Sequence, residues 1–463
     1  MILNRYEEST IKNSVLPPSW QSERILDELD EFLQQNWNQR AIFYDDEKYD
    51  TRQQFLGFTD HKGIRTKKYI GTISYAGEQL NIFPKMFRED LDDNETGGLS
   101  LNHLMKNLIR WIEYCNRVSY PFIHISTELS EATDLRELFI TLYLSYVKAA
   151  IERGLYYRYV EETEDLGYIK GKLDFKDYVL KKIPNGMGHK FRCSYSNFEF
   201  DNRVNRIIKY VCKQLINSST KRNQAIARSI LVRMNDVSDV QCKPSDCDGI
   251  HLSKMHSNYR VILGMSKMFL LNKTSGFSVD SNESFCFLFP TDLLFEGFIG
   301  GFLQETVEKA GGKVSLQKSD MHLIEDVLYA GESLGAAFTM RHDIVVEVKG
   351  NLFILDTKYK AMSRFEGESG ESVKKTISDE TKQADIYQVC EYARKRGVSD
   401  VFLLYPMFRY EDNEPHFPVG KSLGPDGEIA VHFVRLPFVF ENDETSVKNN
   451  LAIVIQNILG IQG

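Results

Sequence analysis

The chain has 463 residues, of which 42% are hydrophobic and 26% are charged, and its formal net charge is −8. This length is too great for a single hydrophobic core and predicts two or three domains, while the composition excludes a disordered chain. The negative charge excludes bulk attraction to polyanions, so any contact with nucleic acid must come from local basic patches.

The N-terminus and the cysteines indicate the cellular compartment. The stretch MILNRYEESTIKNSV lacks a basic region followed by an apolar one, and no segment approaches the roughly 18 apolar residues that span a bilayer. The seven cysteines are scattered without dense spacing, as is typical of reduced thiols. We therefore expect a cytoplasmic protein that has no disulfides and no membrane partner.

The first part of the chain is predicted to be rich in β-strands. In YIGTISYAGEQLNIFP, at residues 69–84, two β-rich runs flank Ala76 and Gly77. The polar stretch REDLDDNETGG, at residues 88–98, indicates a linker. We therefore predict a β-rich N-terminal module over residues 1–95.

Residues 96–280 are predicted to be mostly helical. Apolar residues recur at helical spacing from Leu104 to Ile112 and again from Leu135 to Ala150. Between these helices and the end of the region, DLGYIKGKLDFKDYV alternates apolar and polar residues around glycines. This alternation predicts a β-hairpin insertion near residues 166–179.

One basic patch lies in this helical region. From Arg203 to Arg233 the chain has eight Lys or Arg residues and no Asp or Glu. Those at near-helical spacing are candidate DNA-binding residues: Arg203, Arg206, Lys209 and Lys213. A solvated helix face is the alternative interpretation.

Two cysteines and two histidines raise the alternative of a zinc site, at Cys242, Cys247, His251 and His256. The C-x4-C spacing lies at the edge of the usual range, and no second pair of ligands accompanies it. We therefore favour a polar loop with free thiols.

From residue 281 onward the pattern changes to mixed α and β. The run TDLLFEGFIGGFLQETVEKAGG predicts a helix with Thr291 as its N-cap and Gly311 as its stop. Its predicted buried stripe consists of Phe295, Phe298, Ile299, Phe302 and Leu303. Two strands, a helix from about residue 384 to 396 and the strand DVFLLYP follow, which predicts one α/β domain with a mixed sheet over residues 281–463. The whole chain is thus predicted to be a multidomain protein of the α/β and α+β classes.

The two strands in RHDIVVEVKGNLFILDTKYK carry the candidate chemistry. With the turn centred between Lys349 and Gly350, Asp343 and Asp356 face each other across the strands, with Cβ atoms about 5 Å apart. Lys358 lies two residues past Asp356 and therefore points to the same side of the sheet. Two carboxylates and an ammonium are the minimum equipment for metal-assisted phosphodiester hydrolysis. A surface hairpin with charged ends is the alternative interpretation.

Three further side chains are candidates for the same site. Glu296 interrupts an apolar helix and needs a partner, which a metal ion or its bound water would provide; a helix-edge residue that reaches solvent is the alternative. Gln388 and Tyr392 are spaced i, i+4 on one helix face, where they can hold a phosphate, a base or Lys358. An ordinary helix flank is the alternative for this pair.

The order and spacing of these motifs resemble the PD-(D/E)xK nuclease fold, in which an acid on a helix is followed by Asp, a strand turn, D-x-K and a helix with Q-x3-Y. More closely, LFEGFIGGFL, RHDIVVEVKGNLFILDTKYK, ADIYQVCEYA and VFLLYP resemble the McrC family, the nuclease subunits of McrBC-type restriction systems specific for 5-methylcytosine. The stretches GKLDF and DNRVNR resemble the same family, so the likeness covers roughly residues 100–410.

The resemblance implies a role for each candidate. Asp343 and Asp356 would be metal ligands, and Lys358 would be the water-positioning base. Glu296 would be a metal ligand or an outer acid, and the glutamine and tyrosine of Q-x3-Y would support the site. Lys360 is a further candidate for contact with DNA.

The resemblance also implies cofactors and partners. The expected metal is Mg²⁺, with Mn²⁺ as an alternative, and the expected substrate is double-stranded DNA. A separate McrB-like AAA+ GTPase hexamer would translocate the DNA, and the N-terminal and helical parts, including residues 166–179, would dock on it. Since Val314 follows the lysine in AGGKVS, no G-x4-G-K-[ST] motif is present, and we expect this chain to bind no nucleotide. Two rival hypotheses remain, a non-cleaving activator or scaffold of the motor and a stand-alone repair nuclease of the same fold.

The family pattern is broken at one position near the site. His342 stands where many relatives have proline. This residue is expected to shape the entry of the strand more than the chemistry.

Overall fold

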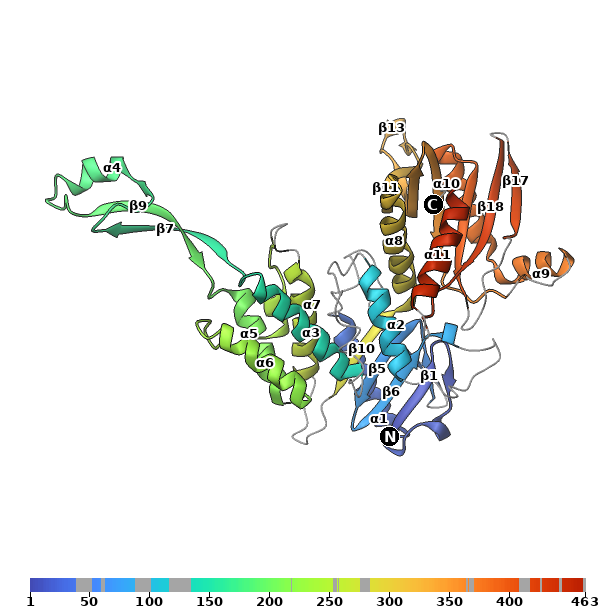
Figure 1. Ribbon diagram of the computed structural model, residues 1–463, viewed down its shortest axis with the longest axis horizontal. Helices are drawn as coiled ribbons and strands as arrows, with labels where there is room; N and C mark the ends of the chain where they lie inside the picture. The colour runs from blue at the N-terminus through green and yellow to red at the C-terminus, as the bar shows by residue number, and fades with distance from the viewer. Residues whose placement is uncertain are drawn as a thin grey trace. The chain divides into compact units, whose positions relative to one another are not determined.

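The structure is a computed structural model that describes most of the chain. The residues described are 1–38, 52–59, 63–87, 101–115, 135–217, 219–252, 256, 258–274, 284–363, 365, 370–407, 417–424, 427–440 and 444–460. The predicted linker at residues 88–98 lies outside them. The chain forms two compact units: unit 1 combines Met1–Arg136 with Ser275–Gly463, and unit 2 is Glu137–Thr274 (Figure 1).

The N-terminal part of unit 1 contains a four-stranded sheet. Its strands, in spatial order, are β1 (Ile2–Tyr6), β6 (Glu78–Phe83), β5 (Tyr69–Tyr75) and β10 (Phe285–Pro290). The two strands predicted at residues 69–84 are confirmed as β5 and β6. Ala76 and Gly77 join them with φ angles of 48° and 77°, which is the geometry of a tight hairpin turn.

A small sheet and a helix complete this part of unit 1. The sheet consists of β2 (Thr10–Ile11), β4 (Ile64–Thr66) and β3 (Leu56–Phe58), and the helix is α1 (Glu23–Asn38). Trp20, Leu29, Leu33 and Ile64 are fully buried and belong to one apolar core with Ile73 of the larger sheet. Burial of these side chains supplies the main stabilisation of the N-terminal part.

The C-terminal part of unit 1 is built on a mixed six-stranded sheet, as predicted. Its strands, in spatial order, are β11 (Lys313–Ile324), β14 (Ala337–Val348), β15 (Asn351–Thr357), β16 (Asp400–Pro406), β18 (Gly427–Leu436) and β17 (Val419–Gly424). Strands β14 and β15 are antiparallel, whereas β16 is parallel to both β15 and β18. A short pair, β12 (Leu328–Tyr329) and β13 (Glu332–Ser333), connects β11 to β14.

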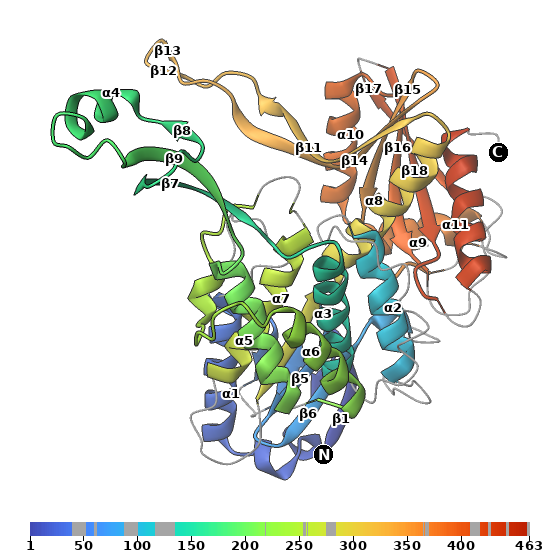
Figure 2. The same cartoon turned by 60° about the vertical axis from the view of Figure 1, so that its left-hand side comes forward.

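Helices cover both faces of this sheet (Figure 2). Val389 of α10 (Gln383–Arg396) shares a core with Ile354 and Leu403, whereas α11 (Glu444–Leu459) approaches Phe353 and Phe402. Because neighbouring residues of a strand point to opposite faces, α10 and α11 lie on opposite sides of the sheet. A further helix, α9 (Gly370–Glu380), occupies part of the polar stretch that precedes α10.

Helix α8 (Thr291–Lys309) carries the predicted apolar stripe, and all of its members are buried. Its N-cap is Pro290, so the prediction of Thr291 as N-cap is wrong by one residue. The reason is that the Thr291 hydroxyl contacts Glu7 and the Lys68 carbonyl instead of capping the helix. The helix ends before Gly311, as predicted, and it packs against α2 (Leu101–Tyr114).

The contact between α2 and α8 is closest at Gly301. A Cβ atom built there would lie 1.8 Å from the Tyr114 carbonyl oxygen, so Gly301→Ala must push the helices apart. Alanine gains about 1 kcal/mol of helix propensity, but backbone overlap outweighs it, and we expect a net loss of roughly 2 kcal/mol in unfolding free energy. Denaturant unfolding measures this loss, with the exposed Glu305→Ala as the control within about 0.5 kcal/mol of wild type. A Gly301→Ala chain of wild-type stability would contradict the close packing.

Unit 2 is mostly helical. Its long helices are α3 (Leu135–Glu152), α5 (Arg203–Asn217), α6 (Lys221–Arg233) and α7 (Asn258–Thr274). None of the helices in the described ranges is both long and apolar enough to cross a membrane.

An arm, residues 158–199, extends from these helices (Figure 1). It contains β7 (Arg158–Leu166), β8 (Lys172–Leu173), the short helices α4 (Phe175–Asp177) and η5 (Tyr178–Lys182), and β9 (Phe191–Glu199). β8 pairs with β9 and not with β7, so residues 166–179 form no hairpin of their own. Asp174 ends the alternating pattern, because its side chain accepts the Asp177 N–H and starts a helical turn.

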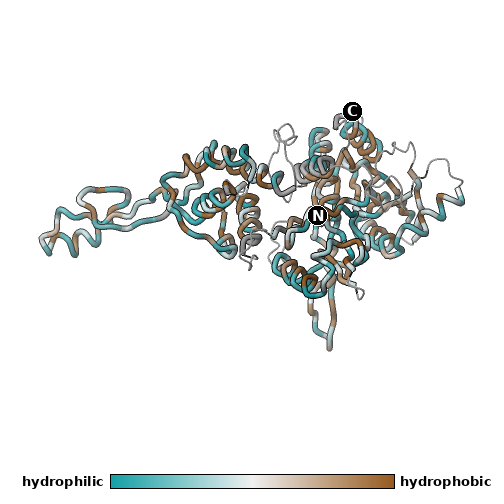
Figure 3. Tube along the Cα trace, turned by 90° about the horizontal axis from the view of Figure 1, so that it is seen from below, coloured by the Kyte–Doolittle hydropathy of each residue, from teal (hydrophilic) through white to brown (hydrophobic). Residues whose placement is uncertain are grey.

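The arm exposes many large apolar side chains. Hydrophobic and hydrophilic residues alternate along its trace (Figure 3). The exposed apolar residues are Tyr159, Tyr168, Ile169, Phe175, Val179, Leu180, Ile183 and Phe198. Polar and aromatic contacts hold the arm from within: Lys182 pairs with Asp165, and the Tyr178 ring stacks on Phe191 with centroids 5.2 Å apart. The apolar residues are therefore not needed to fill a core of the arm.

Candidate active site

The turn between β14 and β15 sets the positions of the two aspartates. Val348 pairs with Asn351 across the turn, and the ladder runs without a shift to the end of the paired strands. Lys349 and Gly350 have φ angles of 51° and 82°, as a two-residue hairpin turn requires. Continued by one residue, this register places Asp343 opposite Asp356, so the predicted turn centre is confirmed.

Asp356 is the most buried carboxylate of the cluster, with 1% of the side chain exposed. One oxygen, Oδ2, lies 2.5 Å from the Lys358 ammonium, while Oδ1 accepts no hydrogen bond from the described residues. Burial, reinforced by the Asp343 carboxylate, raises the pKa of Asp356 to about 7. The site therefore contains a buried carboxylate with an oxygen that is open to a further ligand.

Lys358 lies between two carboxylates. Its Nζ is 2.5 Å from Asp356 and 3.8 Å from Asp385, which also binds Lys360 at 2.5 Å. Burial opposes the charge on Lys358, but Asp356, Asp343 and Asp385 outweigh it and raise its pKa above the usual value. Lys358 is therefore an ammonium at neutral pH.

Asp385 was missed by the sequence reasoning. It occupies the first turn of α10, three residues before Gln388 and seven before Tyr392. That i, i+3, i+7 spacing puts the three polar side chains on one helix face. The spacing was therefore a readable signal for a third acid at the site.

The orientation of Asp343 is fixed by its neighbour on β15. Its Oδ2 accepts both the backbone N–H and the hydroxyl of Thr357, each at 2.9 Å. Both hydrogen bonds are accepted by the same oxygen, so Thr357 leaves the other carboxylate oxygen of Asp343 unoccupied. Thr357, between Asp356 and Lys358 in sequence, is thus a second residue that the sequence reasoning overlooked.

The Q-x3-Y pair supports strand β14. Gln388 donates to the Tyr392 hydroxyl at 2.8 Å, and that hydroxyl donates to the Arg341 carbonyl at 2.8 Å. The expected partners were a phosphate, a base or Lys358, and the partner found is the backbone two residues before Asp343. The pair therefore positions the strand that carries the first aspartate.

His342 packs behind this pair. Its ring lies 4.3 Å from the Tyr392 ring, and its Nε2 accepts from Arg396 at 3.2 Å while Nδ1 faces the Lys318 carbonyl at 3.2 Å. Burial lowers the pKa of His342, so the ring is neutral and carries its proton on Nδ1. The structure therefore gives this position a packing role in the middle of β14, and the expectation that it shapes the entry of the strand is wrong, because β14 begins five residues earlier, at Ala337.

Glu296 reaches the site through one intermediate residue. Gln317 donates to Glu296 at 2.7 Å and accepts from Arg341 at 2.5 Å. Leu316 and Lys318 pair with the neighbours of Asp343, so Gln317 stands opposite Asp343, and its φ of 48° is unusual for a non-glycine residue. No sequence signal identified Gln317.

The candidate metal ligands are few. Among the described residues, no group of three or more His, Cys, Asp or Glu side chains is arranged to hold a metal ion. Asp343 and Asp356 stay candidate ligands as a pair of carboxylates, and Mg²⁺ commonly binds one or two carboxylates together with waters and substrate phosphate.

The zinc candidates do not converge within the described part of unit 2. Cys242 and Cys247 are free thiols, and burial raises their pKa to about 11 and about 12. The His256 ring packs against Tyr156 with centroids 4.9 Å apart. The interpretation as a polar segment with free thiols stays a prediction.

The four basic candidates of α5 all have partners within unit 2. The Arg203 guanidinium donates to the Ser245 carbonyl, Arg206 pairs with Asp201, and Lys209 and Lys213 both pair with Asp239. The acids lie just outside the stretch from Arg203 to Arg233, which is why the stretch looked uncompensated. Their role in DNA binding stays a prediction.

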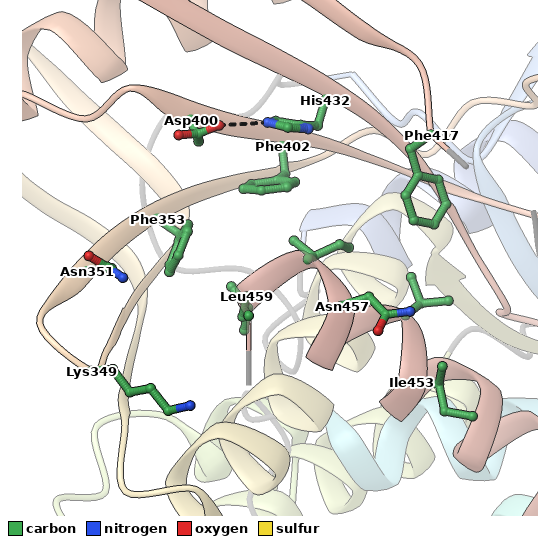
Figure 4. Close-up of a pocket in the computed structure, with 13 residues that line it drawn as sticks. Lys349, Asn351, Phe353, Asp400, Phe402, Phe417, His432, Ile453, Asn457 and Leu459 are labelled. Carbon is green, nitrogen blue, oxygen red and sulfur yellow. Dashed lines mark hydrogen bonds and ion pairs between the residues drawn. The ribbon is translucent and has the colours of Figure 1, made fainter. Parts of the chain in front are cut away.

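A cavity of about 780 Å³ lies beside α11, on the face of the sheet opposite to the one that α10 covers (Figure 4). Phe353, Phe402 and His432 line it, and His432 pairs with Asp400 at 2.9 Å. None of the three central residues, Asp343, Asp356 or Lys358, lines it. The candidate chemistry is therefore separate from this cavity.

Comparisons with known proteins give one matching family model and two similar solved structures. A family model described as "McrBC 5-methylcytosine restriction system component" matches residues 64–406. No curated protein matches the chain. Among solved structures, a half-complex from a tetradecameric assembly of Thermococcus gammatolerans McrB AAA+ hexamers with bound McrC is similar, with a TM-score of 0.60 and 15% identity over 99% of this chain and 100% of that one. The Thermococcus gammatolerans McrBC complex matches with a TM-score of 0.45 and 16% identity over 66% of this chain and 88% of that chain.

Proposed function

Because the chain belongs to the family of McrBC 5-methylcytosine restriction system components, we propose that it is the DNA-cleaving subunit of such a system. In this proposal the C-terminal sheet of unit 1 is a PD-(D/E)xK nuclease domain that hydrolyses phosphodiester bonds in double-stranded DNA. The observation that carries it is the convergence of Asp343, Asp356 and Lys358 where the pairing between β14 and β15 ends, in the middle of β14.

The carboxylate pair fits a hard divalent cation, Mg²⁺ or alternatively Mn²⁺. Asp356 Oδ1 is buried without a hydrogen-bond donor among the described residues, which is costly unless a ligand compensates it. Asp343 faces it with one oxygen occupied by Thr357. When bound, the cation lowers the pKa of a coordinated water and offsets the charge of the phosphate.

The residues of the chain would divide the remaining work. Lys358, held as an ammonium, orients the attacking water by donating a hydrogen bond and offsets negative charge that develops on the phosphate. Thr357 keeps Asp343 in its orientation, and the Gln388–Tyr392 pair keeps β14 in place. Glu296 acts as an outer acid through Gln317.

We further propose that a McrB-like AAA+ GTPase hexamer delivers the DNA. The similar solved structure contains McrB AAA+ hexamers with bound McrC, which supports a partner of this kind. Unit 2 would dock on the partner through the arm, whose apolar side chains are exposed without a core to fill. Lys360, beside the candidate centre, would contact the DNA backbone.

The direct experiment combines the purified chain with a McrB-like GTPase, for which a P-loop GTPase gene next to that of the chain would be the first candidate. Methylated and unmethylated plasmids are incubated with each protein alone and with both, with and without Mg²⁺ and GTP. We expect cleavage only when both proteins, GTP and Mg²⁺ are present. Stimulation of GTP hydrolysis without any cut would instead identify a non-cleaving activator, and cleavage by the chain alone would identify a stand-alone nuclease.

A further inference from the structure

A buried carboxyl group from the N-terminal part of unit 1 reaches the end of β15. Glu7, directly after β1, has no exposed side-chain surface. Its Oε1 accepts the Tyr359 hydroxyl at 2.6 Å and the Lys85 backbone N–H at 3.0 Å, and its Oε2 lies 2.5 Å from the Thr291 hydroxyl. One side chain thus joins three segments that are far apart in the sequence.

Two of these segments carry groups of the candidate centre. Tyr359 directly follows Lys358, and Thr291 is the first residue of the helix that carries Glu296. The Tyr359 ring is buried, with Phe295 and Phe438 each at a centroid distance of 6.0 Å. Glu7 is therefore placed to set the relative positions of β15 and α8.

The main chain at Lys358 is held on two sides. Its backbone N–H donates to the Leu404 carbonyl at 2.8 Å, which ties it to β16. The next residue, Tyr359, is fixed by its buried ring and by the hydrogen bond to Glu7. The position of the backbone from which the Lys358 side chain extends therefore depends on Glu7.

The hydrogen bonds at Thr291 show how the second oxygen of Glu7 is held. The Thr291 hydroxyl lies 2.5 Å from Glu7 Oε2 and 3.1 Å from the Lys68 carbonyl, but it has only one proton to donate. Burial raises the pKa of Glu7. The Thr291 hydroxyl donates to Glu7 Oε2, and the Lys68 carbonyl accepts the Thr291 backbone N–H at 3.2 Å, so each group has a partner. With an amide N–H in place of Oε2, the Thr291 hydroxyl can accept from the amide and donate to Lys68 instead. Glutamine can reproduce this pattern with its amide, whereas leucine cannot.

We propose that Glu7 and Tyr359 are positioning residues for Lys358. Through Glu7, the N-terminal sheet would then help to fix the geometry of the nuclease centre. The inference rests on the proposed function, in which Lys358 orients the attacking water. Displacement of a positioned group by about 1 Å can lower a rate on the order of a hundredfold. The effect should therefore appear in kcat and leave the binding of DNA unchanged.

The test compares five variants in the complete cleavage assay with the partner GTPase. Tyr359→Phe removes only the hydroxyl, Glu7→Leu removes both polar atoms, and Glu7→Gln retains a donor and an acceptor. Tyr143→Phe is the matched control, because it removes another buried hydroxyl, which contacts Ser266 at 3.0 Å in unit 2. Lys358→Ala tests the proposed function itself. Each variant is measured for kcat, KM for DNA, and thermal unfolding.

We expect Tyr359→Phe and Glu7→Leu to lower kcat at least tenfold with KM within twofold of wild type, and Glu7→Gln and Tyr143→Phe to retain most of the activity. Wild-type kcat in Tyr359→Phe, with no activity in Lys358→Ala, would overturn the positioning role alone. Loss of activity in Glu7→Gln equal to that in Glu7→Leu would also overturn it. Wild-type cleavage by Lys358→Ala would instead overturn the proposed function. If Glu7→Leu does not fold, Tyr359→Phe, which retains the buried ring, decides the question.

Discussion

Replacement of Asp356 by asparagine is expected to lower DNA cleavage on the order of a thousandfold while making the fold more stable. Cleavage falls because a neutral amide is a poor ligand for a hard cation, and a loss of about 4 kcal/mol of transition-state stabilisation corresponds to this factor. Plasmid cleavage by the chain with its partner GTPase measures the first effect, and denaturant unfolding at pH 8 measures the second.

The stability gain follows from the raised pKa of Asp356. Between about pH 4 and about pH 7 the folded chain keeps a proton on this carboxyl that the unfolded chain has released. The unfolding free energy therefore falls as the pH rises through this range, and the cost persists above it. This cost is already net of the favourable ion pair with Lys358. Asparagine removes it, so we expect a gain of roughly 2 kcal/mol at pH 8 that shrinks toward pH 4.

Asp343→Asn is the matched control for this prediction. It also removes a candidate metal ligand, so cleavage should fall to a similar degree. Its carboxylate accepts two hydrogen bonds from Thr357, and therefore we expect no gain in stability. Wild-type cleavage by Asp356→Asn, or equal stabilisation by both variants, would contradict this account of the site.

The second large effect is expected at the tip of the arm. Phe175 and Leu180 are 70% and 63% exposed, and the double change Phe175→Ser, Leu180→Ser removes apolar surface without emptying a core. If this surface docks on the partner, its loss should lower the stimulation of GTP hydrolysis at least tenfold, because a few large apolar residues carry most of an interface's binding energy. The stimulated GTPase rate at several partner concentrations measures this effect.

A control from the same unit separates docking from folding. Val232 is 76% exposed on α6, outside the arm, and Val232→Ser should leave the stimulation unchanged. The thermal unfolding of the double variant should match that of wild type. Full stimulation by the double variant would exclude the arm tip from the interface.

The elements that the sequence predicts well are those that depend on neighbouring residues. Lys349 and Gly350 form a two-residue turn with two adjacent positive φ angles. Counting residues outward from this turn along both strands places Asp343 opposite Asp356. Helix α8 has an apolar stripe at helical spacing, and strand β16 has a continuous apolar run. Local information was therefore sufficient for the core of the candidate site.

Two residues that sequence reasoning missed, Glu7 and Gln317, take part in contacts between distant segments. Glu7 meets Tyr359, and Gln317 meets Glu296, across separations that no periodic pattern reports. The basic stretch from Arg203 to Arg233 looked unpaired in the sequence, because its acidic partners Asp201 and Asp239 lie beyond its ends. A single sequence carries no pairing information of this kind, and only the folded chain supplies it.

Strand β10 has a consequence for how the protein is made. It pairs with β5, but β5 ends at Tyr75 and β10 begins only at Phe285, after all of unit 2. At roughly 5–20 residues per second, a ribosome leaves the edge of β5 open for about ten to forty seconds. Unit 2 emerges complete in this interval and can fold first. During the same time the unpaired edge of β5 can pair with another nascent chain. Slower translation of residues 137–274 should therefore reduce the yield of correctly folded protein.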